Sequence, residues 1–216
     1  PTDFGSYYFD VLELIEIVEL AEEVGLPLKM HTNGDAAVSA ALDAFEAVAA
    51  SNGGLGLPHV LEHVVLVSTA DHERMADLGI IASVQPSHWV TAQFSDTVDE
   101  WGEERFATAY DYRALLDAGV TLSLGTDWPV WPTPDGLVQI WAAANHDESS
   151  IETAEALTAY TKGSAASVGR TLDLGALNVG MLADMVVFDA DPLTAAPEDL
   201  TDINVTKVYV AGDRVD

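Results

Sequence analysis

The chain has 216 residues and carries 36 acidic side chains against 8 basic ones, which gives a formal net charge of −28. Hydrophobic residues still make up 49% of the sequence, so its composition excludes the charged, apolar-poor class of disordered chains. So strong a negative charge opposes binding to nucleic acid phosphates and to anionic membranes. We therefore expect a folded protein with a small-molecule partner, and neither nucleic acid nor a membrane as a partner.

The acidic residues are spread over the whole chain. Such a shell is typical of proteins in a salt-rich cytoplasm, where ions screen the mutual repulsion, and ordinary solubilising charge is the alternative. The sequence has no apolar run of about 18 residues and no signal peptide pattern at its start. We expect a cytoplasmic protein of a salt-adapted organism. Cysteine is absent, so any metal site has to use other ligands.

Hydrophobic periodicity predicts strands that alternate with helices over residues 1–169, which indicates parallel βαβ units. In chain order, the predicted elements are a helix over 10–24, a strand over 26–32, a helix over 36–50, a strand over 59–67, a helix over 70–79, a strand over 80–86, a long connection, a helix near 103–118, a strand over 121–127 and helices near 137–145 and 152–168. Residues 170–216 alternate and turn like short antiparallel strands. We expect one α/β domain over 1–169 and a small β module over 170–216.

Three of the four predicted strands end on a side chain that could bind a metal: His31, His63 and Asp127. The carboxyl ends of parallel strands lie at one edge of the sheet, and alternation puts Ser123, Gly125 and Asp127 on one face of the last strand. Two imidazoles and a carboxylate suit a catalytic zinc ion. A single histidine in an apolar strand is more often a hydrogen-bonded core residue, but three such strand ends favour a metal site.

Other polar side chains lie close to these strand ends. His88 is placed to polarise a carbonyl or contact substrate, or else forms a local hydrogen bond. Arg105 is a candidate substrate contact, and a structural ion pair is the alternative role for it. Trp128 is a second candidate substrate contact, and core packing is the alternative role for it. The remaining candidates would act behind a metal ligand: Asp35, which could instead hold a turn, and Glu62. Lys29 is expected to be buried and paired with an acid such as Glu62 or Asp127.

The chain resembles the amidohydrolase superfamily, and within it amidohydrolase family 3, the YtcJ-like proteins. The matching stretches are collinear and cover residues 31–46, 59–88, 109–130, 156–169 and 174–193. The resemblance implies the last four units of a (β/α)8 TIM barrel, followed by part of a β-sandwich domain. It further implies hydrolysis of a C–N bond by metal-activated water, with one or two divalent ions, zinc by preference. His31 and His63 would be metal ligands, and Asp127 would bind metal and shuttle the proton.

Two features of the family are missing from the sequence. In these enzymes, the first barrel strand carries a His-x-His pair and the fourth barrel strand carries a lysine. In this sequence, no two histidines have a single residue between them. The chain is therefore expected to be the carboxyl-terminal half of such an enzyme, and an inactive acidic remnant or a subunit that needs a partner half is the alternative. Since four parallel strands leave two open edges, we expect self-association or binding of a separate amino-terminal half.

Overall fold

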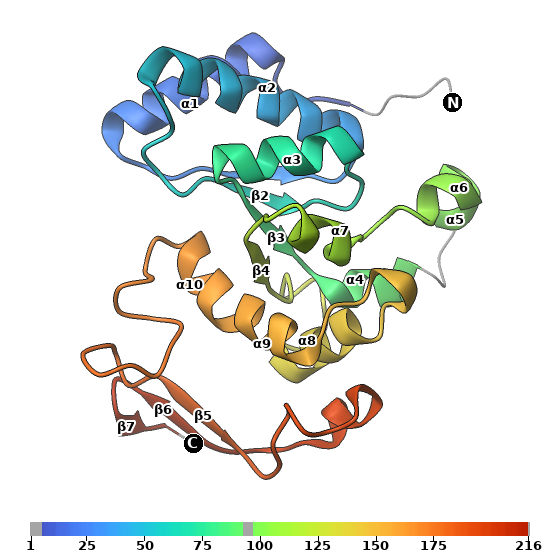
Figure 1. Ribbon diagram of the computed structural model, residues 1–216, viewed down its shortest axis with the longest axis vertical. Helices are drawn as coiled ribbons and strands as arrows, with labels where there is room; N and C mark the ends of the chain where they lie inside the picture. Colours follow the sequence, from blue (N-terminus) through green and yellow to red (C-terminus); the bar gives the residue numbers. More distant parts are fainter. Residues whose placement is uncertain (1–5, 93–96, 216) are drawn as a thin grey trace. The chain divides into compact units, whose positions relative to one another are not determined.

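The computed structural model describes residues 6–92 and 97–215, and its chain divides into two compact units (Figure 1). The first unit comprises Pro1–Val84 and Asp96–Leu122, and the second comprises Gln85–Ser95 and Ser123–Asp216. Residues 93–96, part of the expected long connection, lie outside the described residues, as do residues 1–5 and 216.

The first unit alternates strands and helices, as the periodicity predicts. Its elements are α1 (Val11–Val24), β1 (Lys29–Thr32), α2 (Asp35–Asn52), β2 (Val60–His63), α3 (Thr69–Leu78), β3 (Ile81–Val84), α5 (Thr97–Trp101), α6 (Glu103–Phe106) and α7 (Tyr112–Asp117). The helix expected near 103–118 is two shorter helices, because Tyr110 between them has a left-handed backbone with φ of 58°.

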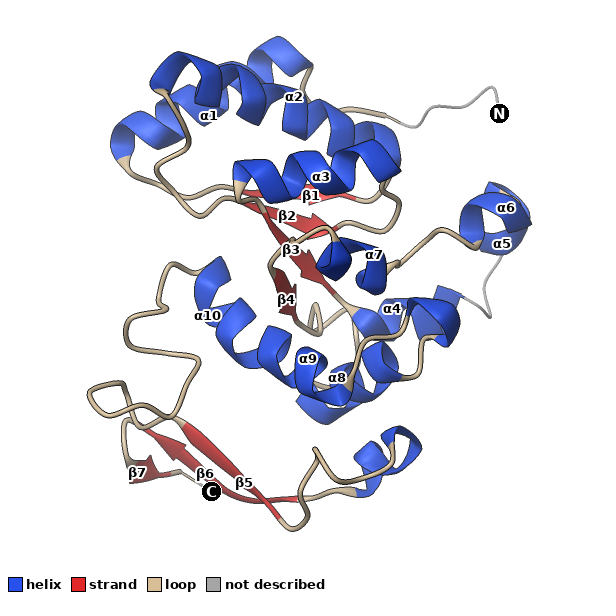
Figure 2. Cartoon of the chain, viewed as in Figure 1, coloured by secondary structure: helices blue, strands red, loops and turns tan. Residues whose placement is uncertain are grey.

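The strands form a sheet with the order β1-β2-β3-β4, which is the order along the chain (Figure 2). β1 pairs in parallel with β2, and β2 in parallel with β3. The Ala82 N–H donates to the Thr121 carbonyl just before β4 (Leu122–Leu124), the strand at which the first unit ends. Because β1 is the end strand of this order, one of its edges has no strand partner among the described residues.

Local sequence signals explain where the helices of this unit begin and end. Asp10 caps α1 in a capping box with Glu13, and Gly25 ends the helix with a left-handed φ of 72°. Ser68 caps α3 by accepting a hydrogen bond from the Asp71 N–H, which decides between Ser68 and Thr69 as the two capping residues that the sequence offers. Helix α2 packs against α1 and α3, and the core of the unit is fully buried: Val18, Val38, Leu42, Phe45, Val48, Val60, Leu61 and Met75.

A buried polar pair links α1 to the segment before β2. His59 has no exposed surface, accepts a hydrogen bond from the Leu28 N–H at Nδ1, and donates from Nε2 to Glu22 Oε1 over 2.7 Å. The Glu22 carboxylate also accepts hydrogen bonds from the N–H groups of Gly56 and Leu57. Burial raises the pKa of Glu22, but these donors and His59 together lower it below the ordinary value of 4.5.

We predict that Glu22→Gln lowers the free energy of unfolding by about 2 kcal/mol at neutral pH, because it removes charge-assisted hydrogen bonds. The lowered pKa means that the ionised carboxylate stabilises the fold above the ordinary glutamate pKa and loses this effect as pH falls through the folded-state pKa. The variant should therefore lose less stability than the wild type on acidification. Urea unfolding at neutral and acid pH measures both effects, with the exposed Glu19→Gln as control. Equal stability of the two variants at neutral pH would contradict the prediction.

The second unit is mainly helical and ends in a small sheet. Its elements are α4 (Pro86–Ala92), α8 (Gly136–Ala144), η1 (Asp147–Ser149), α9 (Thr153–Thr158), the π-helical turn η2 (Ala159–Gly163), α10 (Ser164–Ser167), β5 (Met185–Phe188), η3 (Pro197–Asp202), β6 (Val205–Val210) and β7 (Asp213–Arg214). Helix α8 packs against α4, α9 and η3. The strands β5, β6 and β7 pair antiparallel in that order, as expected for the tail.

The predicted strands were too long. The strand expected over 59–67 is limited to Val60–His63, and the one over 121–127 to Leu122–Leu124, so Asp127 lies beyond the strand and alternation does not determine where it points. All three residues of β4 are buried. Among the described residues, no helix has the length and apolar character needed to cross a membrane.

Candidate metal and substrate site

Two of the predicted metal ligands lie on neighbouring strands of the first unit. His31 is in β1 and His63 ends β2, and the parallel register pairs His63 with Thr32. The two imidazole rings meet edge to face with their centroids 4.4 Å apart. His31 Nε2 is 3.2 Å from the amide Nδ2 of Asn33. The expected juxtaposition of these two histidines is therefore present.

Backbone strain marks the same positions. His63 has a φ of 74° and Val64 a φ of 48°, and Asp127, after β4, has a φ of 55°. Residues other than glycine rarely adopt such left-handed values, and valine is especially disfavoured there. Strained residues of this kind concentrate at functional sites, where the strain aims a side chain. Two of the three predicted ligands thus adopt a backbone conformation that costs free energy.

In the second unit, His88 and Asp127 lie close together. His88 Nε2 is 3.9 Å from Asp127 Oδ2, which is too long for a direct hydrogen bond. His88 lies in α4, where its N–H donates to the Gln85 carbonyl. The preceding Ser87 N–H donates to the buried amide oxygen of Gln139 over 3.0 Å. The carboxyl end of β4 and the first turn of α4 therefore bring an imidazole next to a carboxylate.

Arg105 and Asp35 pair with each other. The Arg105 guanidinium donates from Nη2 to Asp35 Oδ1 over 2.9 Å, which realises the structural ion pair that the sequence left as an alternative for Arg105. Asp35 begins α2, and its Oδ1 also accepts from the Ala36 N–H. Both side chains line an open pocket of about 370 Å³ within the first unit.

The other predicted residues have simpler surroundings. Glu62 Oε1 is 3.3 Å from Lys29 Nζ, which confirms the expected partner of this lysine, although Lys29 is exposed and not buried. Trp128 is 62% exposed, so core packing does not account for it. Trp89 is buried and stacks on His146 at a centroid distance of 4.1 Å.

Two pocket residues were not singled out from the sequence. His72, in α3, and Asp111, the N-cap of α7, line the same pocket as Arg105. Burial is the largest influence on His72 and lowers its pKa, while the carboxylates of Asp111 and Asp71 oppose that shift. The position of Asp111 before a helical segment is a capping signal that was available in the sequence. No local signal connects either residue with Arg105.

Comparison with known proteins gives collinear matches over almost the whole chain. A family model described as "Amidohydrolase family" matches residues 3–216. The N-substituted formamide deformylase of Arthrobacter pascens is 30% identical over 98% of this chain and 40% of its own length. The putative amidohydrolase YtcJ of Bacillus subtilis is 27% identical over 100% of this chain and 42% of its own length. The chain thus spans about 40% of the length of these relatives.

Solved structures give the same result. A metal-dependent hydrolase from Pyrococcus horikoshii, described as uncharacterized, superposes with a TM-score of 0.80 at 30% identity, over 91% of this chain and 41% of that one. A metal-dependent hydrolase from Pyrococcus furiosus, also described as uncharacterized, gives a TM-score of 0.78 at 34% identity, over 90% of this chain and 40% of that one.

Proposed function

Because the chain belongs to the amidohydrolase family, we propose that it is part of a metal-dependent hydrolase that cleaves an amide-type carbon–nitrogen bond. The observation that carries this proposal is the pair of imidazoles from the ends of adjacent parallel strands, 4.4 Å apart. The similarity to an N-substituted formamide deformylase and to metal-dependent hydrolases supports the same reaction class.

The donor set suits a divalent ion of the zinc class. We propose His31, His63 and Asp127 as its ligands, since two neutral imidazole nitrogens and a carboxylate oxygen are the donors that catalytic zinc sites use. The strained backbone at His63 and Asp127 supports this choice. When bound, such an ion polarises a carbonyl oxygen and lowers the pKa of a coordinated water.

The remaining steps belong to side chains of this chain. Asp127 would accept the proton of the attacking water and pass it to the leaving nitrogen. His88, 3.9 Å from that carboxylate, would orient it or donate a hydrogen bond to the substrate carbonyl oxygen. The exposed indole of Trp128, next in sequence to Asp127, would contact an apolar part of the substrate. Glu62 would hold Lys29 near the histidine pair.

An activity measurement tests the reaction class. In zinc-loaded protein, Asp127→Asn should lower amine release from an N-substituted formamide by about 100-fold or more, because the amide cannot take up and deliver the proton. The exposed Asp77→Asn on α3 is a matched control and should retain the wild-type rate. Wild-type activity in Asp127→Asn would contradict the role of Asp127. If the zinc-loaded wild type releases no amine, the result favours the alternative that this chain is an inactive remnant. The missing His-x-His pair is the reason for that alternative.

We further propose that the strands β1–β4 and their helices are a partial TIM barrel, with residues 170–216 as part of a β-sandwich. Four strands in chain order, each followed by helix, support the first part. The sheet β5–β7 leaves Val186, Val205 and Val210 about half exposed, as a sheet without its facing layer would. An edge strand and uncovered apolar sides favour a partner, either another copy or an amino-terminal half.

The solution mass tests this association. We predict that the purified chain at low micromolar concentration has at least twice the 23.0 kDa of a single copy, or gains mass when a separately expressed amino-terminal half is added. Light scattering coupled to size-exclusion chromatography gives the mass directly. A stable monomer that does not respond to the added half would contradict the proposal.

A further inference from the structure

The pocket around Arg105 lies at the same edge of the sheet as the histidine pair. Asp35 follows β1, Leu66 and Ser68 follow β2, and Arg105 and Asp111 belong to the connection after β3. The wall of the pocket is joined to His31 by two hydrogen bonds, since Asn33 Nδ2 is 3.2 Å from His31 Nε2 and the Asn33 carbonyl accepts from the Leu66 N–H over 3.1 Å. The pocket is therefore a near neighbour of a proposed metal ligand.

The charges in the pocket form an adjacent pair of opposite sign. Asp35 accepts from Nη2 of Arg105 through one carboxylate oxygen, and within the described part of the chain the other guanidinium N–H groups of Arg105 remain for a ligand. The two side chains are 50% and 40% exposed. An ion pair with this exposure contributes little stability, so sharing it with a ligand costs little free energy.

The other lining residues narrow the class of ligand. The Asp111 carboxylate accepts the Ala114 N–H as a helix cap, whereas Asp35 accepts both the Ala36 N–H and Arg105 at Oδ1. Its second oxygen, Oδ2, therefore lies beside the guanidinium, where a ligand with adjacent charges would place its cation. Leu66, Val67 and Ala114 provide an apolar wall beside the ion pair. A ligand with a carboxylate alone would be repelled by the acids of the pocket and by the net negative charge of the chain. A ligand with an amine alone would be repelled by Arg105.

We propose that this pocket binds an α-amino acid group, with the ligand carboxylate on Arg105, its ammonium group on Asp35 and its side chain against Leu66 and Val67. The two charges of an α-amino acid are adjacent, as are those of Arg105 and Asp35, so the two pairs form a square of alternating charges. Resting on the proposed function, this makes the pocket the subsite for the end of the substrate remote from the cleaved bond. The substrate class is then an amide that carries a free α-amino acid group.

Binding of three matched probes tests this proposal. L-norvaline carries both charges, pentanoate lacks the amine and butan-1-amine lacks the carboxylate. The binding is followed by NMR in the metal-free intact protein. Norvaline should shift the amide signals of Leu66 to Thr69 until they saturate. It should bind about tenfold or more tightly than either other probe, because each of those probes lacks one charge-assisted contact. Arg105→Gln and Asp35→Asn should each weaken norvaline binding by a similar factor.

A second ion pair of the same type provides the control. Arg113 and Asp117 pair over 2.8 Å on α7 and do not line the pocket, so Arg113→Gln should leave norvaline binding unchanged. Norvaline shifts that do not saturate, equal binding of pentanoate or butan-1-amine, or full binding in Arg105→Gln would overturn the proposal. Because no metal or turnover is involved, such a failure is distinct from a failure of the hydrolase assignment, which zinc binding and amine release report.

Discussion

Replacing His63 by alanine is expected to lower the affinity of the chain for zinc by more than about 100-fold, since even residues that only support a metal ligand change metal affinity by 10–100-fold. The expectation depends on the edge-to-face contact of His63 with His31 and on its left-handed backbone, which places the imidazole at the end of β2. Zinc titration against a competing chelator measures the affinity of the wild type and the variant under the same conditions.

A matched control separates a metal site from general binding to an acidic protein. His72→Ala removes another partly buried histidine of the first unit that is not a proposed ligand, and it should leave zinc affinity unchanged. Two results would indicate adventitious binding of zinc to surface carboxylates. One is an equal loss of zinc affinity in His63→Ala and His72→Ala, and the other is weak binding of several zinc equivalents by the wild type.

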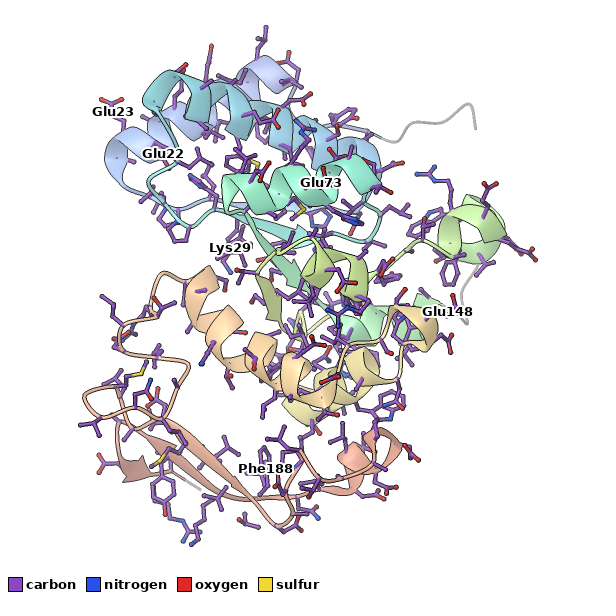
Figure 3. The ribbon with its side chains drawn as sticks, in the orientation of Figure 1. Glu22, Glu23, Lys29, Glu73, Glu148 and Phe188 are labelled. Carbon is purple, nitrogen blue, oxygen red and sulfur yellow. The ribbon has the colours of Figure 1, made fainter. Side chains whose placement is uncertain are left out.

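The second large effect concerns salt. We predict that the melting temperature rises by roughly 10 °C between about 0.1 M and 2 M potassium chloride, because the Debye length falls from about 10 Å to less than 3 Å. The net charge of −28 supplies the repulsion that is screened. Figure 3 shows Glu23, Glu73 and Glu148, which are exposed, on elements of both units. Several basic side chains are already paired with acids: Lys29, Arg74, Arg105, Arg113 and Arg170.

A charge variant tests the cause of this salt effect. Glu19 and Glu23 are four residues apart on the exposed side of α1, a spacing at which like charges destabilise a helix. The double variant Glu19→Gln and Glu23→Gln should therefore melt higher than the wild type at low salt and gain less from added salt. A melting temperature that is the same at both salt concentrations would show that the acidic surface is ordinary solubilising charge.

The sequence predicts the regular elements because their signals are local. Asp10 and Glu13 form a capping box, Ser68 caps α3 and Gly25 ends α1, so the helix boundaries follow from a few neighbouring residues. Polar residues at the ends of apolar runs identified His31 and His63, and their contact follows from parallel pairing of adjacent strands. These predictions depend on period and spacing alone.

Contacts between distant residues that do not lie on paired strands escaped prediction. The Glu22–His59 pair joins residues 37 positions apart, and the Asp35–Arg105 pair joins residues 70 apart. Strand alternation also failed for Asp127, because β4 ends at Leu124 and the chain then turns through a left-handed conformation. Neither an ion pair between a helix or loop and a distant segment nor positive φ at a residue other than glycine has a signal in the neighbouring sequence.

The most direct test of the proposed metal centre is anomalous X-ray diffraction at the zinc absorption edge from crystals of the zinc-loaded protein. We predict an anomalous peak at coordination distance from the imidazole nitrogens of His31 and His63 and from a carboxylate oxygen of Asp127. Anomalous peaks confined to surface carboxylates, with none at the ends of β1 and β2, would contradict the assignment of this chain to the metal centre of a hydrolase.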